Sequence, residues 1–221
     1  MKAKCFFLFL FIGIKMFSQL PKGFVYADQV IPNLEVELRY YSDNNFVGKR
    51  IDGYLSDTLI LTYDAALALV KVQEELQQKN LRLKIYDGYR PQRAVNHFIL
   101  WARDLNDTIN KKYFYPNVAK ADLFKQEYIA TRSGHSKGST VDLTIINTVT
   151  KTELDMGSPY DFFGHQSWVN YQAITPKQKA NRYLLQQVML KYGFRNYPKE
   201  WWHFTLKNEP FPKTYFDFVI K

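Results

Sequence analysis

Apolar residues along this chain recur at two spacings, one typical of strands and one typical of helices. Alternation of apolar and polar residues predicts strands over residues 36–40, 81–85, 141–145 and 201–206. Helical spacing appears from Thr62 to Gln78, after Pro91, and from Pro176 to Tyr192. The two kinds of element follow one another without a regular strand–helix–strand rhythm. The pattern therefore favours an α+β fold over a doubly wound parallel sheet.

The length and composition of the chain indicate one domain with a sizeable core. The chain has 221 residues, of which 46% are hydrophobic and 17% aromatic. It contains no internal repeat, no low-complexity tract and no linker rich in Gly, Ser or Pro. We therefore expect a single catalytic or binding domain over residues 20–221.

The first 19 residues have the pattern of a secretory signal peptide. Lys2 and Lys4 precede an apolar run from Cys5 to Ile14, and a short polar stretch follows. The run is too short to span a bilayer comfortably, since about 20 apolar residues are needed, although an uncleaved anchor stays open as an alternative. We expect a periplasmic or secreted protein with no stable membrane insertion after cleavage. Cys5 is the single cysteine, so the mature chain would form no disulfide and would build any metal site from His, Asp and Glu.

The net charge of +9 changes this picture little. The basic residues are scattered and form no stripe, so we expect no nucleic-acid partner. Attraction to anionic envelope polymers and a plainly solvated surface are both compatible with the charge.

Two short segments carry the residue types of a metal site. In the first, His135 and Asp142 are seven positions apart, and a turn at Gly138 could bring them together as nitrogen and oxygen ligands. In the second, Glu200 precedes His203 by three positions, so a bulge or turn is needed if both face one metal. Taken separately, each segment is equally compatible with a packed histidine beside an unrelated acid.

A third segment, from Tyr86 to Gln92, places Arg90 at a strand-to-helix junction. A fixed guanidinium there could stabilise an oxyanion. Taken alone, the residue is more simply explained as a surface or ion-paired arginine.

Together these motifs resemble those of the VanX-type D-alanyl-D-alanine dipeptidases, a family of zinc peptidases specific for D-amino acids. The resemblance extends from about residue 33 to residue 211. The motifs that carry it lie at residues 38–41, 43–48, 87–92, 133–142, 155–161 and 200–203. The resemblance implies a small, mainly antiparallel sheet flanked by helices, in the architecture of the hedgehog and D,D-peptidase proteins.

The resemblance also implies roles for individual residues. Three of them match zinc ligands for one Zn²⁺ per chain: His135, Asp142 and His203. Glu200 matches the general acid/base, and Arg90 matches the arginine that stabilises the oxyanion.

Further matches concern the substrate. Asp161 matches a carboxylate that binds the substrate ammonium, and Tyr40 and Ser133 match residues lining the substrate pocket. Two positions depart from the family pattern. Thr140 replaces an alanine beside Asp142, and Trp168 replaces a histidine at the expected pocket rim.

These matches predict zinc-dependent hydrolysis of the D-alanyl-D-alanine dipeptide to two D-alanines, in cell-wall turnover or scavenging. One alternative is a D,D-carboxypeptidase or endopeptidase acting on longer peptidoglycan peptides. A second is a non-catalytic protein that binds envelope peptides. The sequence gives no indication of the oligomeric state.

Overall fold

A five-stranded sheet forms the centre of the protein in a computed structural model that describes residues 20–221. The predicted signal peptide over residues 1–19 lies outside the described residues. The strands run in the spatial order β2 (Glu35–Val36), β4 (Leu81–Asp87), β5 (Thr140–Asn147), β7 (Glu200–Leu206) and β6 (Phe194–Tyr197). Only the β2–β4 pair is parallel. The prediction of an α+β fold with a mainly antiparallel sheet is therefore confirmed.

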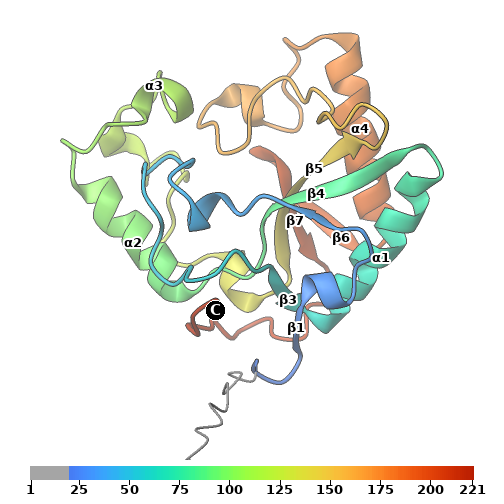
Figure 1. Ribbon diagram of the computed structural model, residues 1–221. Helices are drawn as coiled ribbons and strands as arrows, with labels where there is room; N and C mark the ends of the chain where they lie inside the picture. Colours follow the sequence, from blue (N-terminus) through green and yellow to red (C-terminus); the bar gives the residue numbers. More distant parts are fainter. Residues whose placement is uncertain (1–19) are drawn as a thin grey trace, which may run out of the picture.

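Helices α1 (Tyr63–Gln77) and α4 (Pro176–Lys191) lie together beside the sheet (Figure 1). Their apolar faces share one core with the sheet, to which Leu69, Leu143 and Leu185 all contribute. The predicted starts of both helices are explained by N-terminal caps. The Thr62 side chain accepts a hydrogen bond from the backbone of Ala65, and Thr175 forms a capping box with Gln178.

A second core lies on the other side of the molecule, around α2 (Gln92–Arg103) and the short helix α3 (Lys111–Phe114) (Figure 1). It includes the two-stranded sheet of β1 (Phe24–Tyr26) and β3 (Ile60–Thr62). Its packing is largely aromatic, and Phe46 contacts the rings of Phe98, Trp101 and Phe163. Residues of this aromatic core and residues of β5 and β7 line the cavity described below.

The predicted strand over residues 36–40 is wrong beyond its first residue, Val36. Strand β2 covers only Glu35–Val36, and a 3-10 turn over Arg39–Tyr41 follows it. Leu38 packs into the sheet core, whereas Tyr40 packs into the aromatic core. A chain that crosses between two cores buries alternate residues without forming a strand, which is why the alternation was misleading.

Within residues 20–221, the structure has no helix with the length and apolar character needed to cross a membrane.

Candidate active site

The register of the central strands brings two predicted site residues face to face. Asp142 on β5 pairs with His203 on β7, and Asp87 on β4 pairs with Asp142 from the other side. His135 joins them from the 3-10 turn η4 (Gly134–Lys137), which immediately precedes β5. The chain reverses at Gly138, whose φ of 82° lies in the left-handed region that favours glycine. The turn expected at Gly138 is therefore present and carries His135 back over Asp142.

The ligand atoms of His135, Asp142 and His203 all lie within 4.8 Å of one another. Oδ1 of Asp142 is 3.0 Å from Nδ1 of His203 and 3.3 Å from Nε2 of His135. The two ring nitrogens are 3.3 Å apart. Three donors thus converge on one point, as a metal site with an open fourth position requires.

The hydrogen bonding of these side chains fits a bound zinc ion. Oδ1 of Asp142 is buried and accepts no hydrogen bond from any residue in the described range 20–221. Nδ1 of His135 lies 2.8 Å from the carbonyl oxygen of Gly88. Donation to that carbonyl leaves Nε2 of His135 unprotonated and free to bind a metal. Two imidazole nitrogens and one carboxylate oxygen form a donor set that suits Zn²⁺.

The electrostatics of Asp142 agree with this role. Burial opposes ionisation of the carboxyl group, but His135 and His203 outweigh that effect and hold its pKa well below the usual range. The histidines have this effect while they are protonated; when they bind a metal ion as neutral imidazoles, the charge of the ion keeps Asp142 ionised instead.

Glu200 is the first residue of β7 and lies beside this cluster. Its Oε2 is 3.3 Å from Nδ1 of His203. Glu200 pairs with Tyr197 across the hairpin, and the register of β6 and β7 shifts between Asn196 and Tyr197. This irregularity supplies the turn that the three-residue spacing demanded, so that Glu200 and His203 line the same cavity.

Arg90 is held in place by Asp87, which is fully buried. Its Nε donates to Oδ2 of Asp87 at 2.8 Å, and Nη2 lies 2.7 Å from the same oxygen. Nη2 is also 3.5 Å from Oδ2 of Asp142. The guanidinium lies 4.8 Å from the ring centroid of Tyr40 and 5.3 Å from that of Phe98. A cation fixed on so many sides is a preorganised electrostatic group.

Asp161 lies at the opposite end of the cavity from Arg90 and His135. Its Oδ2 accepts a hydrogen bond of 2.8 Å from the Tyr40 hydroxyl. Burial raises the pKa of Asp161 well above its usual value, and the charge of Asp142 adds to the effect. A cation bound beside Asp161 would compensate the buried charge and favour the ionised carboxylate.

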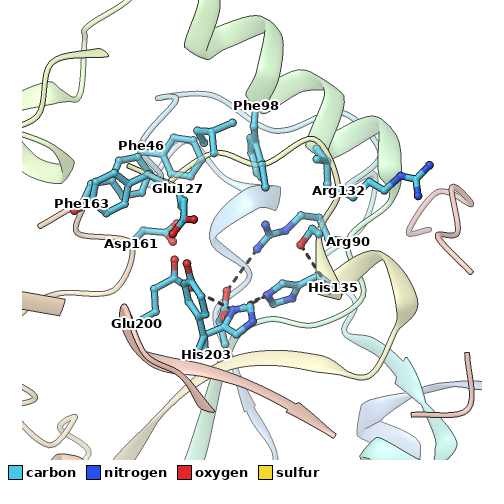
Figure 2. A pocket seen from close by; sticks show the side chains of 18 of the residues that line it. Phe46, Arg90, Phe98, Glu127, Arg132, His135, Asp161, Phe163, Glu200 and His203 are labelled. Carbon is cyan, nitrogen blue, oxygen red and sulfur yellow. Dashed lines mark hydrogen bonds and ion pairs between the residues drawn. The ribbon is translucent and has the colours of Figure 1, made fainter. Parts of the chain in front are cut away.

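The cavity that joins these groups has a volume of about 400 Å³. Figure 2 shows Arg90 and His135 on one side and Asp161 and Glu200 on the other, with His203 below. Three phenylalanines complete the wall: Phe46, Phe98 and Phe163. A cavity of this size, apolar on one side and with opposite charges at its ends, suits a small zwitterion.

Ser133 and Tyr40 both line the cavity, and their contact with a substrate stays a prediction. The Ser133 hydroxyl also accepts a hydrogen bond of 3.3 Å from the backbone of His135 and thereby caps η4. It therefore contributes to the position of a metal-ligating side chain as well as to the cavity wall.

A model of the family described as "D-ala-D-ala dipeptidase" matches residues 21–221. The chain belongs to this family. A D-alanyl-D-alanine dipeptidase of Streptomyces coelicolor is 39% identical over 197 residues, covering 89% of this chain and 98% of the relative. A D-alanyl-D-alanine dipeptidase of Enterococcus faecium is 36% identical over 199 residues, covering 90% of this chain and 98% of that relative.

Among solved structures, a vancomycin resistance D,D-pentapeptidase in complex with Zn(II) aligns with a TM-score of 0.42 at 16% identity. The alignment covers 70% of this chain and 77% of that chain. Because this likeness is low, membership of the family rests on the sequence matches.

The two residues that depart from the family pattern are not among those that line the cavity. The Thr140 hydroxyl is 2.9 Å from that of Thr205 on β7, so it links two strands and does not crowd Asp142. Trp168 packs on His165, with ring centroids 4.4 Å apart, and is absent from the cavity lining. Its ring centroid is 5.9 Å from Nζ of Lys199, and it interacts with the side chain of Tyr128, which does line the cavity, so an effect of Trp168 on the pocket rim stays a prediction.

Sequence reasoning missed several residues that the structure brings to the site. Tyr54 donates a 2.6 Å hydrogen bond to Asp87 from a loop 33 positions earlier. Tyr160 lies next to Asp161 in the chain and donates a 3.1 Å hydrogen bond to Asp142. In the sequence, Tyr160 was indicated only by its place in the motif over residues 155–161, and that motif predicted a role for Asp161 alone.

Proposed function

We propose that this protein hydrolyses D-alanyl-D-alanine to two molecules of D-alanine, with one zinc ion held by His135, Asp142 and His203. The observation that carries the proposal is the distribution of charge in the cavity. A set of metal ligands and a separate buried carboxylate, Asp161, face the same cavity, and Figure 2 shows Asp161 across the cavity from His135. Both lie in a cavity of about 400 Å³.

The carboxylate of Asp161 explains the preference for a dipeptide. A free ammonium group would neutralise its buried charge, and a longer peptide would present an uncharged amide in the same place. Burying a carboxylate without a cation costs kilocalories per mole. The dipeptide is therefore favoured over longer wall peptides by the charge of one residue and the limited volume.

The side chains of the cavity have different roles in the hydrolysis. When bound, zinc supplies the positive charge that acidifies water and polarises a carbonyl group. Glu200 accepts the proton of the attacking water and passes it to the amide nitrogen as the peptide bond breaks. Arg90, fixed by Asp87, stabilises the negative charge that develops on the carbonyl oxygen. Tyr40 holds Asp161 in position for the substrate ammonium.

The leader over residues 1–19 supports a location in the periplasm or outside the cell. There the enzyme would meet dipeptide released from the cell wall and not the cytoplasmic pool of new dipeptide. We therefore propose a role in wall turnover or nutrition. Expression of the full chain with a C-terminal tag, followed by cell fractionation, tests the location. Recovery of the uncleaved chain in the cytoplasm would contradict it.

The function is tested by release of D-alanine from D-alanyl-D-alanine by the zinc-loaded protein, with and without a chelator. The expected result is release that the chelator abolishes and that added zinc restores. A muramyl pentapeptide ending in D-alanyl-D-alanine serves as the comparison substrate and should be cleaved far more slowly. Cleavage of the pentapeptide alone would replace the dipeptidase with a D,D-carboxypeptidase.

A further inference from the structure

The two oxygens of the Asp142 carboxylate have different surroundings. Oδ1 faces the two histidines and accepts no hydrogen bond from residues 20–221. Oδ2 points the other way, toward Tyr160 and Arg90. An isolated carboxylate could rotate and offer either oxygen, or both, to a metal ion. Some neighbouring group must therefore keep Oδ2 turned away.

Tyr160 is the better placed of the two donors to Oδ2. Its hydroxyl donates at 3.1 Å, whereas Nη2 of Arg90 is 3.5 Å away. The Arg90 contact stands at the limit of a hydrogen bond, and the same nitrogen is 2.7 Å from Asp87. The Tyr160 hydroxyl is therefore the principal restraint on Oδ2.

The Tyr160 ring is itself firmly held, which a restraining group must be. It is buried and stacks on the ring of Tyr86, with centroids 4.5 Å apart. The indole of Trp202 packs on it edge to face at 5.4 Å. The Arg39 guanidinium lies 5.9 Å from its centroid. Packing on several sides leaves the hydroxyl little freedom to leave Asp142.

The same hydroxyl reaches toward the amine end of the cavity. It is 3.4 Å from the Tyr40 hydroxyl, which donates to Asp161. Each hydroxyl has one hydrogen, which Tyr160 donates to Asp142 at the shorter distance and Tyr40 donates to Asp161, so the two hydroxyl oxygens are neighbours without a hydrogen bond between them. Tyr160 therefore lies where the two halves of the site meet.

We infer that Tyr160 is a positioning residue of the metal centre: its hydroxyl holds Oδ2 of Asp142 so that Oδ1 alone faces the metal ion. The inference rests on the metal site of the proposed function. Groups that orient a metal ligand in this way typically contribute about 10- to 100-fold in metal affinity or activity. Tyr160 acts on the reaction only through Asp142.

The test is the zinc dissociation constant of Tyr160→Phe, measured by competition with a chromophoric chelator and without any substrate. The substitution removes one oxygen atom and keeps the aromatic packing. We expect the affinity for zinc to fall about 10- to 100-fold relative to the wild-type protein. Because no substrate is present, the result does not depend on which peptide the enzyme cleaves.

Tyr86→Phe is the matched control. Tyr86 is buried and stacks on Tyr160, but its hydroxyl interacts with Glu153, away from the metal ligands. We expect wild-type zinc affinity in this variant. Equal affinities in all three proteins, or an equal loss in both variants, would overturn the inference. A wild-type protein without zinc affinity would overturn it together with the proposed function, whereas intact zinc binding without dipeptide hydrolysis would overturn the function alone.

A second pair of variants keeps the test decisive if Tyr160→Phe does not fold. 4-Aminophenylalanine and 4-fluorophenylalanine, each introduced in place of Tyr160, both fill the space of the hydroxyl, but only the amine donates a hydrogen bond. We expect the amino variant to bind zinc at least tenfold more tightly than the fluoro variant. Equal affinities in this pair would overturn the inference.

Discussion

The two ends of the cavity are built in different ways. At the metal end, Asp142 and His203 are neighbours on paired strands, and His135 is anchored to a backbone carbonyl oxygen. At the amine end, Asp161 lies outside the strands and helices, with a left-handed φ of 59°. Its carboxylate accepts one hydrogen bond, from a tyrosine 121 positions away.

This difference indicates that the metal end carries out catalysis and that the amine end selects the substrate. The sheet holds Asp142 and His203, and the carbonyl of Gly88 holds His135, before any ligand binds, so that little reorganisation is needed at the moment of reaction. The buried carboxylate of Asp161 has a raised pKa and is compensated only when a cation enters. Damage to the metal end should therefore abolish catalysis, whereas damage to the amine end should alter which substrate is accepted.

The largest effect is expected from removal of a metal ligand. Asp142→Ala deletes the only oxygen donor of the cluster and leaves two histidines, which bind zinc too weakly to retain it. Hydrolysis of D-alanyl-D-alanine should fall to the level of the chelator-treated wild-type protein. Zinc content after dialysis, together with D-alanine release, measures this. One zinc ion per chain retained by the variant would show that Asp142 is not a ligand.

Glu200→Gln should separate metal binding from catalysis, because Glu200 lies beside His203 without belonging to the three metal ligands. The amide keeps the shape of the side chain but cannot accept a proton, so kcat should fall about 10²- to 10⁴-fold. Zinc content should remain at the wild-type value, because Glu200 is not part of the ligand set. A variant that loses its zinc would instead identify Glu200 as a ligand.

Asp161→Asn tests the amine end. Asparagine tolerates the left-handed conformation and can still accept a hydrogen bond from Tyr40, so mainly the charge is lost. Removing one partner of a buried charge pair costs about 2–5 kcal/mol, which should appear in kcat/KM for D-alanyl-D-alanine. Zinc affinity should be unchanged.

An N-acetylated dipeptide is the matching substrate for this variant. It lacks the ammonium group, and the limited cavity volume still disfavours it, so the variant should gain little activity on it. Unchanged activity of Asp161→Asn on the free dipeptide would remove Asp161 from substrate binding.

The same contrast governs how much of the molecule could be predicted from the sequence. The sequences around Asp142 and His203 alternate clearly, although both strands are buried on both faces in the structure, so the alternation indicated the strands and not their register. The caps at Thr62 and Thr175 marked the starts of two helices. The residues of the metal end therefore stood in predictable elements, and the family resemblance named them.

Contacts between distant irregular segments could not be predicted in this way. Tyr54 reaches Asp87 from a loop packed in the aromatic core, and Tyr160 reaches Asp142 from a loop packed in the sheet core. The spacing of apolar residues along the sequence does not predict such contacts, because tertiary packing sets the direction of a side chain in a loop. For the same reason the pattern over residues 36–40 predicted a strand where a turn carries Tyr40 into the cavity.

The smallest effect is expected at the mouth of the cavity, where Lys199 pairs with Glu127. Lys199 belongs to the hairpin that carries Glu200, so the pair ties this hairpin to the segment around Glu127, which also lines the cavity. The Glu127 side chain is 66% exposed, and exposed ion pairs contribute about 0–1 kcal/mol. Lys199→Met should therefore change kcat/KM by less than about fivefold, with Glu127→Gln as its matched control. A loss above about 100-fold in both variants, with zinc retained, would show that this pair positions Glu200 and that the metal end also depends on a loop.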